Sequence, residues 1–525
     1  MRKPSIEDIK RRKNGLDVWH DIERCATAGY ESLDPDALEL FRWYGLYEQR
    51  PRRGLFMVRI RVPGGAITAV QARAVAQVGR DFAGGRIDVT TRQDLQLHSV
   101  PLRQIPEVIR RLHEAGLSTT FACGDTPRNV VACPLAGRLD GEIADAREAV
   151  RTWERIHAAN RSFANLPRKL KTSLCTCPAQ CTIPQIHDVS FVAQARRRGQ
   201  RRAKLEPGYA LLVGGGLGTR FLPALPLDVW LPEHRLGEVA EALTTLYATQ
   251  APRQSRSHAR LRYLVRDWSP QGFRDRLGKL LGSELDRAEP VPLADTTFRE
   301  HLGPGHQRER TRQYLSLVTT AGRSSPEDLF VAATVAERWG SGLLLLTTMQ
   351  NLIVPDIAAE RLEEATDRLA LAPTARVRSS DHRAGTVACT GAEYCELALA
   401  ETKDLAASVV DALEKDGVSS PVPLNVSVSG CPNDCAHAQI ADIGLMGAQA
   451  RGSDAEADVF DLLIGGRLGQ GARAGRLLRA KVPADQVPGE VTSIVRAFAA
   501  GRRGSESFAV FAERYVDQAA GEYQI

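Results

Sequence analysis

Four cysteines in the C-terminal half of the chain lie in two short loops. Cys389 and Cys395 form a C-x5-C pair, and Cys431 and Cys435 form a C-x3-C pair farther along. Four thiolates from two loops suit a cubane iron–sulfur cluster, in which each iron takes one protein sulfur. Zinc also accepts four thiolates, but its usual pairs are separated by about two to four residues. Four buried free cysteines remain as the alternative, which the polar, Gly- and Pro-containing loops argue against.

The sequence also contains an internal repeat. TTRQDL at 90–95 is similar to TTMQNL at 347–352, and CPAQCTIPQIHDVSFV at 177–192 is similar to CPNDCAHAQIADIGLM at 431–446. Ala122-Cys123 is matched with Ala388-Cys389, and the glycine-rich residues 213–218 with residues 464–469. Because the matches keep the same order in both halves, they indicate a duplicated architecture.

Each half alternates segments typical of strands with segments typical of helices. The expected strands are 53–62, 86–91, 118–123, 314–320 and 342–348, and the expected helices are 68–82, 106–117 and 325–339. Thr68 and Ser325 are placed to cap two of these helices. This alternation predicts two α/β layers about a pseudo-two-fold axis. The region 270–310, rich in Pro, Gly and charge, is expected to link the halves.

The two cysteine pairs beside a duplicated α/β chain resemble the sirohaem-dependent assimilatory sulfite/nitrite reductase family of the ferredoxin-dependent type. Its members carry sirohaem coupled to a 4Fe-4S cluster. The resemblance implies that Cys389, Cys395, Cys431 and Cys435 hold the cluster, and that the Cys435 thiolate also bridges to the sirohaem iron. A shared sulfur leaves no gap for electrons to cross between the two cofactors.

The implied fold class is α/β (α+β), with ferredoxin-like half-domains and two larger cofactor-binding α/β domains. The expected segments are an N-terminal helical extension at 1–35, a ferredoxin-like half-domain at 36–110, a sirohaem-binding domain at 111–290, a linker and second ferredoxin-like half-domain at 291–372, a cluster- and sirohaem-binding domain at 373–510, and a C-terminal tail at 511–525.

Reduction of an anion at iron requires a cationic pocket that can donate protons. The resemblance assigns this role to Arg59, Arg128, Lys169 and Lys171. Alternation along an extended strand would direct both lysines to one face. The chain has only 10 lysines against 59 arginines, so two lysines within three residues indicate a need for a group that can lose a proton. A solvated strand edge is the alternative for this pair.

The carboxylates of a buried sirohaem need positive partners. The residues that resemble family contacts are Arg92, the backbone N–H groups of two glycine-rich turns, Asn433 and Arg467. The turns are represented by Gly214, Gly215 and Gly216 in the first half and by Gly465 and Gly466 in the second.

Other cysteines do not fit the family pattern. Cys175, Cys177 and Cys181 lie close together, and the latter two occupy the place of Cys431 and Cys435, but Asn129 stands six residues after Cys123. A second cubane therefore lacks a ligand unless Cys133 or a non-cysteine group completes it, and the favoured interpretation is a relic of duplication kept as reduced thiols. Tyr47 and Cys123 match positions that some members join by a thioether bond, with Tyr47 as a plain core aromatic residue as the alternative.

The predicted function is ferredoxin-dependent six-electron reduction of sulfite to sulfide, with nitrite to ammonia as the alternative. Lys171 and the Tyr47/Cys123 pair favour sulfite, because in the family the second basic position tends to be Lys in sulfite reducers and Asn in plant-type nitrite reducers. The CPAQC loop, however, also occurs in relatives labelled nitrite reductases. Two further alternatives are an oxygen-dependent ring-hydroxylating enzyme of the precorrin-3B synthase type and a non-catalytic iron–sulfur electron carrier. GGGLG lacks the G-x-G-x-x-G spacing of a dinucleotide site, so electrons are expected from a separate, acidic ferredoxin.

The composition of the 525 residues narrows the class of protein further. With 43% hydrophobic and 25% charged residues and a mean hydropathy of −0.24, neither disorder nor a coiled coil fits. No apolar run reaches the length of about 18 residues that a membrane helix needs, and the charged N-terminus lacks the apolar centre of a secretory signal. A net charge of +6 spread along the chain does not favour nucleic acid. We expect a cytoplasmic monomer.

Overall fold

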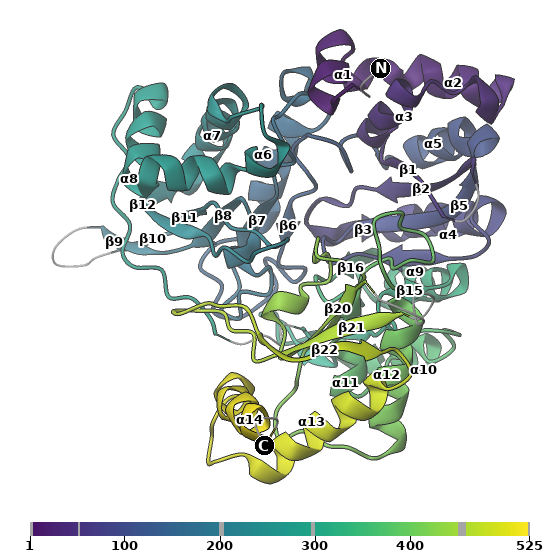
Figure 1. The fold of residues 1–525 in the computed structure, drawn as a ribbon, viewed down its shortest axis with the longest axis vertical. Coiled ribbons are helices and arrows are strands. Elements are labelled where there is room, and N and C mark those ends of the chain that lie inside the picture. The colour runs from purple at the N-terminus through teal and green to yellow at the C-terminus, as the bar shows by residue number, and fades with distance from the viewer. Residues whose placement is uncertain (1–3, 51–52, 199–203, 296–299, 450–457, 523–525) are drawn as a thin grey trace.

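The computed structural model describes residues 4–50, 53–198, 204–295, 300–449 and 458–522. Three lobes are visible in Figure 1. The upper right carries α2 (Trp19–Ala28), α3 (Pro35–Phe41) and α5 (Ile105–Glu114), and the upper left carries α6 (Ala146–His157), α7 (Leu236–Gln250) and α8 (Leu261–Leu281). The bottom carries α12 (Lys403–Lys415), α13 (Val487–Gly501) and α14 (Phe508–Glu522). The chain also forms the short helices α1 (Ile6–Arg12), α10 (Leu362–Leu369) and α11 (Asp381–Ala384).

Two five-stranded sheets exchange a strand between the two halves of the chain. The first sheet has the order β1-β2-β5-β4-β15, and the second has the order β13-β14-β17-β16-β3. Strand β3 therefore leaves the first half to pair with β16, and β15 leaves the second half to pair with β4. The bounds are β1 Leu46–Glu48, β2 Leu55–Ile60, β3 Ala66–Thr68, β4 Ile87–Val89, β5 Leu95–Pro101, β13 Gly305–His306, β14 Arg312–Leu317, β15 Arg323–Ser324, β16 Leu343–Leu346 and β17 Leu352–Ala358.

Among the helices that cover these sheets, α4 (Ala69–Phe82) from the first half and α9 (Pro326–Trp339) from the second pack on each other. Both begin with a capping box at the expected residue, Thr68 for α4 and Ser325 for α9. The apolar faces of both helices are buried in one hydrophobic core that contains strands of both halves. The helices expected at 68–82 and 325–339 are thus confirmed.

The other two sheets repeat one topology. Their orders are β12-β11-β8-β7-β6 and β18-β19-β20-β21-β22, each with three parallel strands followed by antiparallel ones. The first half adds a hairpin of β9 (Arg196–Arg198) and β10 (Lys204–Glu206). The remaining bounds are β6 Val131–Ala132, β7 Thr172–Cys175, β8 Val189–Ala193, β11 Gly208–Val213, β12 Leu225–Pro232, β18 Thr386–Ala388, β19 Val426–Ser429, β20 Ile443–Ala448, β21 Val459–Ile464 and β22 Arg476–Pro483. The predicted duplicated α/β fold with ferredoxin-like half-domains is confirmed.

The matching strand orders of these two sheets correct one match of the sequence repeat. Strand β6 corresponds to β18, so the residue that follows β6, Cys133, corresponds to Cys389. Side-chain contacts agree: the Gln93 amide exchanges two hydrogen bonds with the Ala132 backbone, and the Gln350 amide does the same with Ala388. The pairing of Cys123 with Cys389 was therefore wrong, because two adjacent residues carry too little pattern to fix a register.

Three expected local structures differ from the prediction. Residues 118–123 form turns with a single bridge from Ser118 to Arg61, because Phe121 has a left-handed φ of 62° and donates its N–H to the Trp43 carbonyl. The lysine pair flanks Leu170, which makes an isolated bridge and not a strand. Helix α8 extends to Leu281, well into the expected link, and its kink lies at Ser269, just before Pro270.

The predicted segment boundaries stay a prediction. The boundary after residue 110 falls inside α5, whose apolar residues belong to the core of the ferredoxin-like sheets. Helix α14 crosses the boundary after residue 510, and residues 1–3 and 523–525 of the predicted terminal segments lie outside the described residues.

Candidate active site

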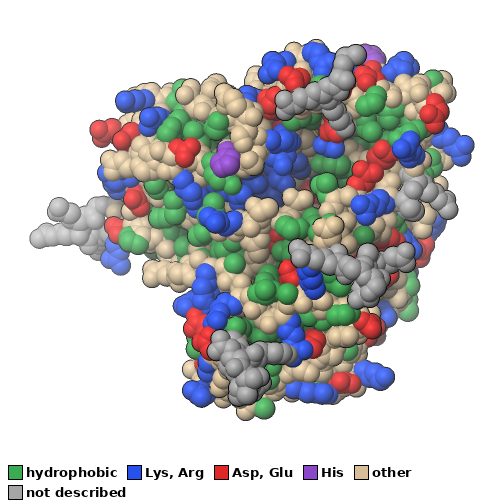
Figure 2. Space-filling model, in the orientation of Figure 1, with side chains coloured by type: hydrophobic (Ala, Val, Ile, Leu, Met, Phe, Trp, Pro, Cys, Tyr) green, Lys and Arg blue, Asp and Glu red, His purple; other side chains and the backbone are tan. Residues whose placement is uncertain are grey.

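A cavity lies where the first ferredoxin-like sheet meets both cofactor-type α/β domains. Ten of the predicted site residues line it, and they come from widely separated segments of the chain. They are Arg59, Arg92, Arg128, Lys169, Lys171, Cys389, Cys395, Cys431, Asn433 and Cys435. Figure 2 shows Lys and Arg side chains gathered in the hollow between the upper lobes. The fold therefore places the cysteine loops opposite a set of cations.

Parallel strands bring the two cysteine loops together. Cys389 directly follows β18, and a single residue separates Cys431 from the end of β19. Both cysteines therefore lie at the carboxyl edge of neighbouring strands. The Gly430 N–H donates to the Cys389 sulfur at 3.2 Å. The Asp434 carboxylate fixes the second loop by accepting hydrogen bonds from the Ser429 hydroxyl and two backbone N–H groups.

The donor set fits a cationic cluster. Burial raises the pKa of Cys389 to about 12, and the nearby Cys435 sulfur adds to this effect. Burial likewise raises the pKa values of Cys395 and Cys431. Cysteine binds metal as the thiolate. At these buried positions the thiols lose their protons readily only when a positively charged metal is bound to them. The residues present thus match the chemistry of an iron–sulfur cluster.

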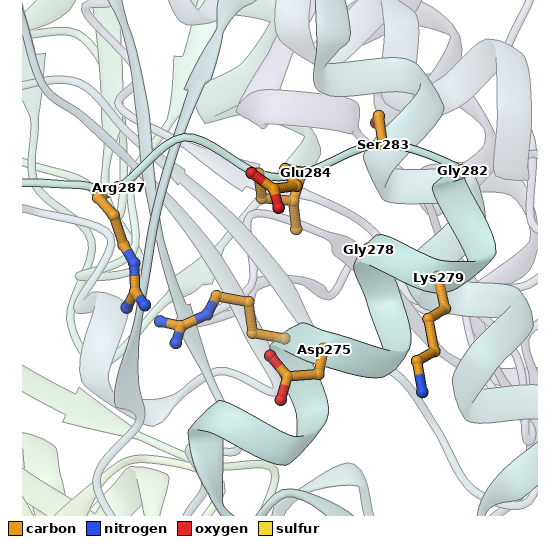
Figure 3. Close-up of a pocket in the computed structure, with 9 residues that line it drawn as sticks. Asp275, Gly278, Lys279, Gly282, Ser283, Glu284 and Arg287 are labelled. Atoms are coloured by element: carbon orange, nitrogen blue, oxygen red, sulfur yellow. The ribbon is translucent and has the colours of Figure 1, made fainter.

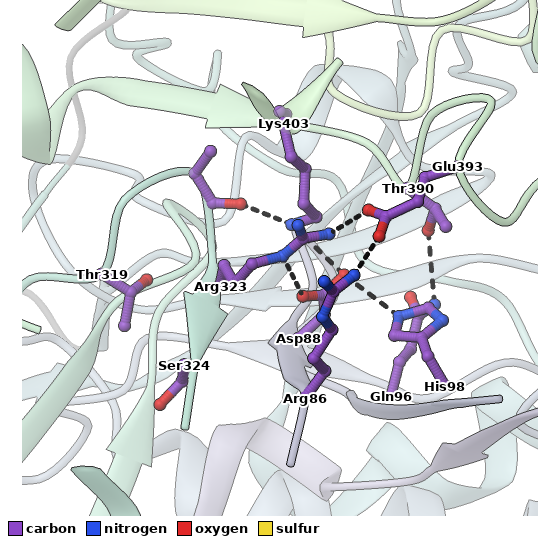
Figure 4. Close-up of polar contacts among 12 residues, drawn as sticks. Arg86, Asp88, Gln96, His98, Thr319, Arg323, Ser324, Thr390, Glu393 and Lys403 are labelled. Carbon is purple, nitrogen blue, oxygen red and sulfur yellow. Dashed lines mark hydrogen bonds and ion pairs between the residues drawn. The ribbon is translucent and has the colours of Figure 1, made fainter. Parts of the chain in front are cut away.

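A buried network of charges positions the C-x5-C loop (Figure 4). Asp88 on β4 lies 3.1 Å from the His98 ring and 3.4 Å from the Lys403 ammonium, with Arg323 at 3.6 Å. Arg323 also pairs with Glu393, inside the C-x5-C loop, at 2.8 Å. These contacts connect the first sheet to the cysteine loop, and they give His98 a structural role.

The arginines carry unsatisfied donors that fit an anionic cofactor. Arg128 is held by three hydrogen bonds to the carbonyls of Ala122 and Gly124. Arg59 and Arg92 each have a buried Nε without a hydrogen-bond partner. Burial, with repulsion from Arg128, lowers the pKa of Arg92 to about 10. Buried guanidinium N–H groups of this kind suit the carboxylates of a macrocycle or an oxyanion.

Lys169 and Lys171 are half-buried, and neighbouring positive charges repel their ammonium groups. Burial, followed by repulsion from Lys171, holds the pKa of Lys169 well below its usual value. Burial and repulsion from Arg92 lower the pKa of Lys171 to about 7. Both ammonium groups can therefore release a proton more readily than an exposed lysine.

Sequence reasoning missed Asp94, which also lines the cavity. Its carboxyl is buried, one oxygen has no hydrogen-bond partner, and burial raises its pKa to about 6 against the pull of Arg59 and Arg92. A position-by-position comparison of the repeats could have found it, because the second half has Asn351 at the same place in the motif. The acid therefore stands only in the first-half copy of the motif, which faces Cys389, Cys395, Cys431 and Cys435.

The glycine-rich turns behave differently from the expectation. Their residues do not line the cavity, and the N–H groups of Gly214, Gly215 and Gly216 donate to backbone carbonyls. The same holds for the N–H groups of Gly465, Gly466 and Arg467. The amide donors of these six residues are therefore already used within the protein, and contact of the turns with sirohaem stays a prediction. Across the pseudo-two-fold axis, Gln185 bonds to Gly469 and Gln439 to Gly218.

Tyr47 and Cys123 are neighbours of Arg59 beside the cavity. The Arg59 guanidinium donates to the Cys123 sulfur at 3.2 Å and lies 6.0 Å from the centre of the Tyr47 ring. Burial and the Cys123 sulfur both raise the pKa of Tyr47. The thioether bond between them stays a prediction.

A second hollow lies at the end of α8, between Asp275 and Arg287 (Figure 3). Its lining combines glycines with side chains of both charges and contains none of the cysteines. We assign it no chemistry.

Two family models match this chain. One, described as the nitrite and sulphite reductase 4Fe-4S domain, matches residues 123–285 and 379–515. The other, described as the nitrite/sulfite reductase ferredoxin-like half domain, matches residues 47–115 and 306–372. Sulfite reductase (ferredoxin) 2 of Mycolicibacterium paratuberculosis is 34% identical, over 97% of this chain and 94% of that protein. The chain belongs to the nitrite and sulfite reductase family.

Other relatives carry both substrate names. The assimilatory ferredoxin-dependent nitrite reductase of Haloferax mediterranei is 33% identical over 98% of this chain and 92% of its own length. Ferredoxin–nitrite reductase of Synechococcus elongatus is 32% identical over 92% of this chain and 94% of its own length. The solved structure of Mycobacterium tuberculosis NirA protein matches with a TM-score of 0.89 and 33% identity, covering 98% of this chain and 97% of that one.

Family membership confirms the predicted class of enzyme. The chain is a ferredoxin-dependent oxidoreductase of the sulfite/nitrite type, with sirohaem and a 4Fe-4S cluster as cofactors and a small anion as substrate. Among the residues that the structure describes, no helix combines the length and apolarity needed to cross a membrane.

Proposed function

We propose that this family member acts preferentially on sulfite and reduces it to sulfide. The observation that carries the proposal is that Lys169 and Lys171 both line the cavity on which the four cysteines open. Lysine at the second position is the residue that the resemblance associates with sulfite reducers. The mycobacterial relative named as a sulfite reductase adds support.

The cluster would be held by Cys389, Cys395, Cys431 and Cys435, and sirohaem would be held by Arg92 and its cationic neighbours. When bound, the paired cofactors would supply the electrons that reduce the anion. Arg59 and Arg128 would bind and orient that anion, since guanidinium groups recognise oxyanions through paired N–H donors. Arg128 is pre-positioned by its carbonyl contacts, which lowers the cost of ordering it.

Protons are the second requirement. Conversion of bisulfite to hydrosulfide consumes six electrons and six protons and releases three water molecules. Lys171 would hold a transferable proton on its Nζ near neutral pH, because its pKa is lowered to about 7. Asp94, with a pKa raised to about 6, would hold another on its carboxyl oxygen. Water entering the cavity would then re-protonate both groups.

Nitrite reduction is the second candidate, favoured by the two relatives named as nitrite reductases. The same cations would bind nitrite, and the same groups would supply the protons for ammonium. The two anions differ in shape and charge, so the rate ratio decides between them.

The test is a comparison of kcat/KM for sulfite and nitrite with reduced ferredoxin as donor. We expect the larger value for sulfite, and a larger value for nitrite would overturn the preference. Lys171→Asn should lower kcat/KM for sulfite by about 100-fold, the lower end of the usual contribution of a general acid, with cofactor absorption retained. The exposed Lys415→Asn serves as the matched control and should leave both rates unchanged.

We also propose that the enzyme is a cytoplasmic monomer. Both halves of the pseudo-two-fold arrangement come from one chain, which supports a complete site without a second copy. Light scattering of the purified protein tests the oligomeric state, and fractionation of the producing cell tests the location.

A further inference from the structure

Four potential metal ligands converge away from the candidate active site. They are the sulfurs of Cys133, Cys177 and Cys181 and a ring nitrogen of His301, and these atoms all lie within 4.8 Å of one another. All three cysteines are buried, and His301 is half-buried. Within the described residues, no other group of three or more Cys, His or acidic side chains is gathered this tightly.

The position of this group is explained by the duplication. Cys133 corresponds to Cys389, and Cys177 and Cys181 correspond to Cys431 and Cys435 in the repeated loop. The contact from Thr348 to the Cys181 carbonyl repeats the contact from Thr91 to the Cys435 carbonyl. Three ligand positions of the cluster site are thus retained in the first half.

The fourth position has changed. The residue six places after Cys133, where Cys395 stands after Cys389, is Leu139. In its place His301, from the segment that joins the two halves, directs its ring at the cysteines. Its Nε2 lies 3.6 Å from the Cys133 sulfur. The sulfurs have a new fourth partner, which a mere relic of the cluster site would not need.

The spacing of these atoms decides between a cluster and a single ion. The sulfurs of Cys177 and Cys181 are 3.4 Å apart. Around one tetrahedral ion with metal–sulfur bonds of about 2.3 Å, neighbouring sulfurs stand about 3.8 Å apart, and a sulfur and an imidazole nitrogen stand slightly closer. The thiolates of a cubane bind four different irons and must stand farther apart than this. The observed distances match a mononuclear site.

We propose that Cys133, Cys177, Cys181 and His301 bind one Zn²⁺ ion. Three thiolates and one imidazole form one of the donor sets of structural zinc sites, and soft sulfur ligands select against magnesium and calcium. Four protein ligands leave no open position, so the ion has a structural and not a catalytic role. This proposal replaces the expectation that these cysteines are reduced thiols without a function.

The zinc site would cross-link the first α/β domain to the segment that packs on the second ferredoxin-like half. Its cysteines belong to the first α/β domain, while the residue before the histidine, Glu300, accepts hydrogen bonds from Thr347 and Asn351 of the second ferredoxin-like half. Thr348 of that same loop bonds to the Cys181 carbonyl at 2.7 Å. Zinc binding therefore stabilises the packing of the linking segment between the halves.

Metal analysis and zinc-edge X-ray absorption of the purified holoenzyme test the proposal. We expect one zinc per chain in addition to the iron of the cofactors, with a first shell of three sulfurs at about 2.3 Å and one nitrogen at about 2.0 Å. Zinc at background level in protein produced in zinc-containing medium overturns the proposal. An iron content above that of one sirohaem and one 4Fe-4S cluster, with no zinc, also overturns it.

Variants test the ligands. Cys177→Ser combined with Cys181→Ser should abolish zinc binding, whereas Cys25→Ser, at a buried cysteine elsewhere in the fold, should retain it. Should the double variant fail to fold, His301→Cys provides the second measurement, because it should keep zinc and change the shell to four sulfurs. Zinc retained by the folded double variant, or an unchanged shell in His301→Cys, overturns the assignment.

Discussion

Replacement of Asp88 by Asn should strongly destabilise the protein. The Asp88 carboxylate is 3% exposed, and it lies against the Lys403 ammonium, also 3% exposed, and against His98 and Arg323. Burial alone would raise its pKa, but these three partners hold the pKa of Asp88 well below its usual value. Asn keeps the shape of the side chain but removes the charge, which leaves the buried Lys403 cation uncompensated.

The magnitude follows from the burial of the pair. Breaking a buried ion pair by removing one partner costs about 3–5 kcal/mol. For domains of the size present here, about 1 kcal/mol lowers the melting temperature by about 2–4 °C, so the expected loss is about 6–20 °C. Differential scanning fluorimetry of matched holoenzyme preparations measures this change.

Two variants make the test specific. Asp404 also faces Arg323, at 3.9 Å, but it is 86% exposed, so Asp404→Asn should change stability by at most about 0.5 kcal/mol. Adding Lys403→Met to Asp88→Asn removes the stranded cation and should recover part of the loss. Equal melting temperatures for Asp88→Asn and Asp404→Asn would refute the reasoning.

Further predictions concern acid stability, the glycine turns and the cluster. Burial lowers the pKa of His157 to about 3, so the unfolded chain takes up this proton first and stability should fall as the pH drops from about 6.5 towards 3. The melting temperature of His157→Gln should therefore depend less steeply on pH in that window, and an identical slope would contradict this. A Cβ at Gly215 would lie 2.5 Å from the Gln185 carbonyl oxygen, so Gly215→Ala should cost about 1–3 kcal/mol by overpacking. In contrast, Gly489→Ala has open space within a helix and should raise the melting temperature slightly. Cys435→Ser should abolish anion reduction and alter the cofactor spectrum, and full turnover with intact bands would exclude Cys435 as the bridging ligand.

Local signals in the sequence predicted the elements that depend on local interactions. The helix at 69–82 was predicted because both of its signals are local in sequence: a capping box at Thr68 and an apolar stripe along the helix. Residues 118–123 have the β-branched and aromatic composition of a strand, yet Phe121 bonds to Trp43 far away in the sequence. The prediction failed there because a long-range contact overrides propensity.

In the candidate site too, residues with a local sequence pattern were predicted, and residues brought together only by folding were not. The spacing of Cys389 and Cys395 predicted a metal site from the sequence alone. The resemblance to a known family predicted the basic residues of the cavity. His301 carries no such pattern, because its partners Cys133 and Cys177 are more than a hundred residues away and only the folded chain brings them near. The contacts of the glycine turns, which serve the protein's own backbone, were likewise invisible before the halves were packed together.

The exchange of β3 and β15 between the two ferredoxin-like sheets has a consequence for biosynthesis. While the ribosome is still translating the first half, the edge of β4 has no neighbour, since Arg323 and Ser324 have not yet been made. The nascent first half therefore carries an unpaired sheet edge until about 230 further residues have been made, and an unpaired edge of this kind can pair with other chains.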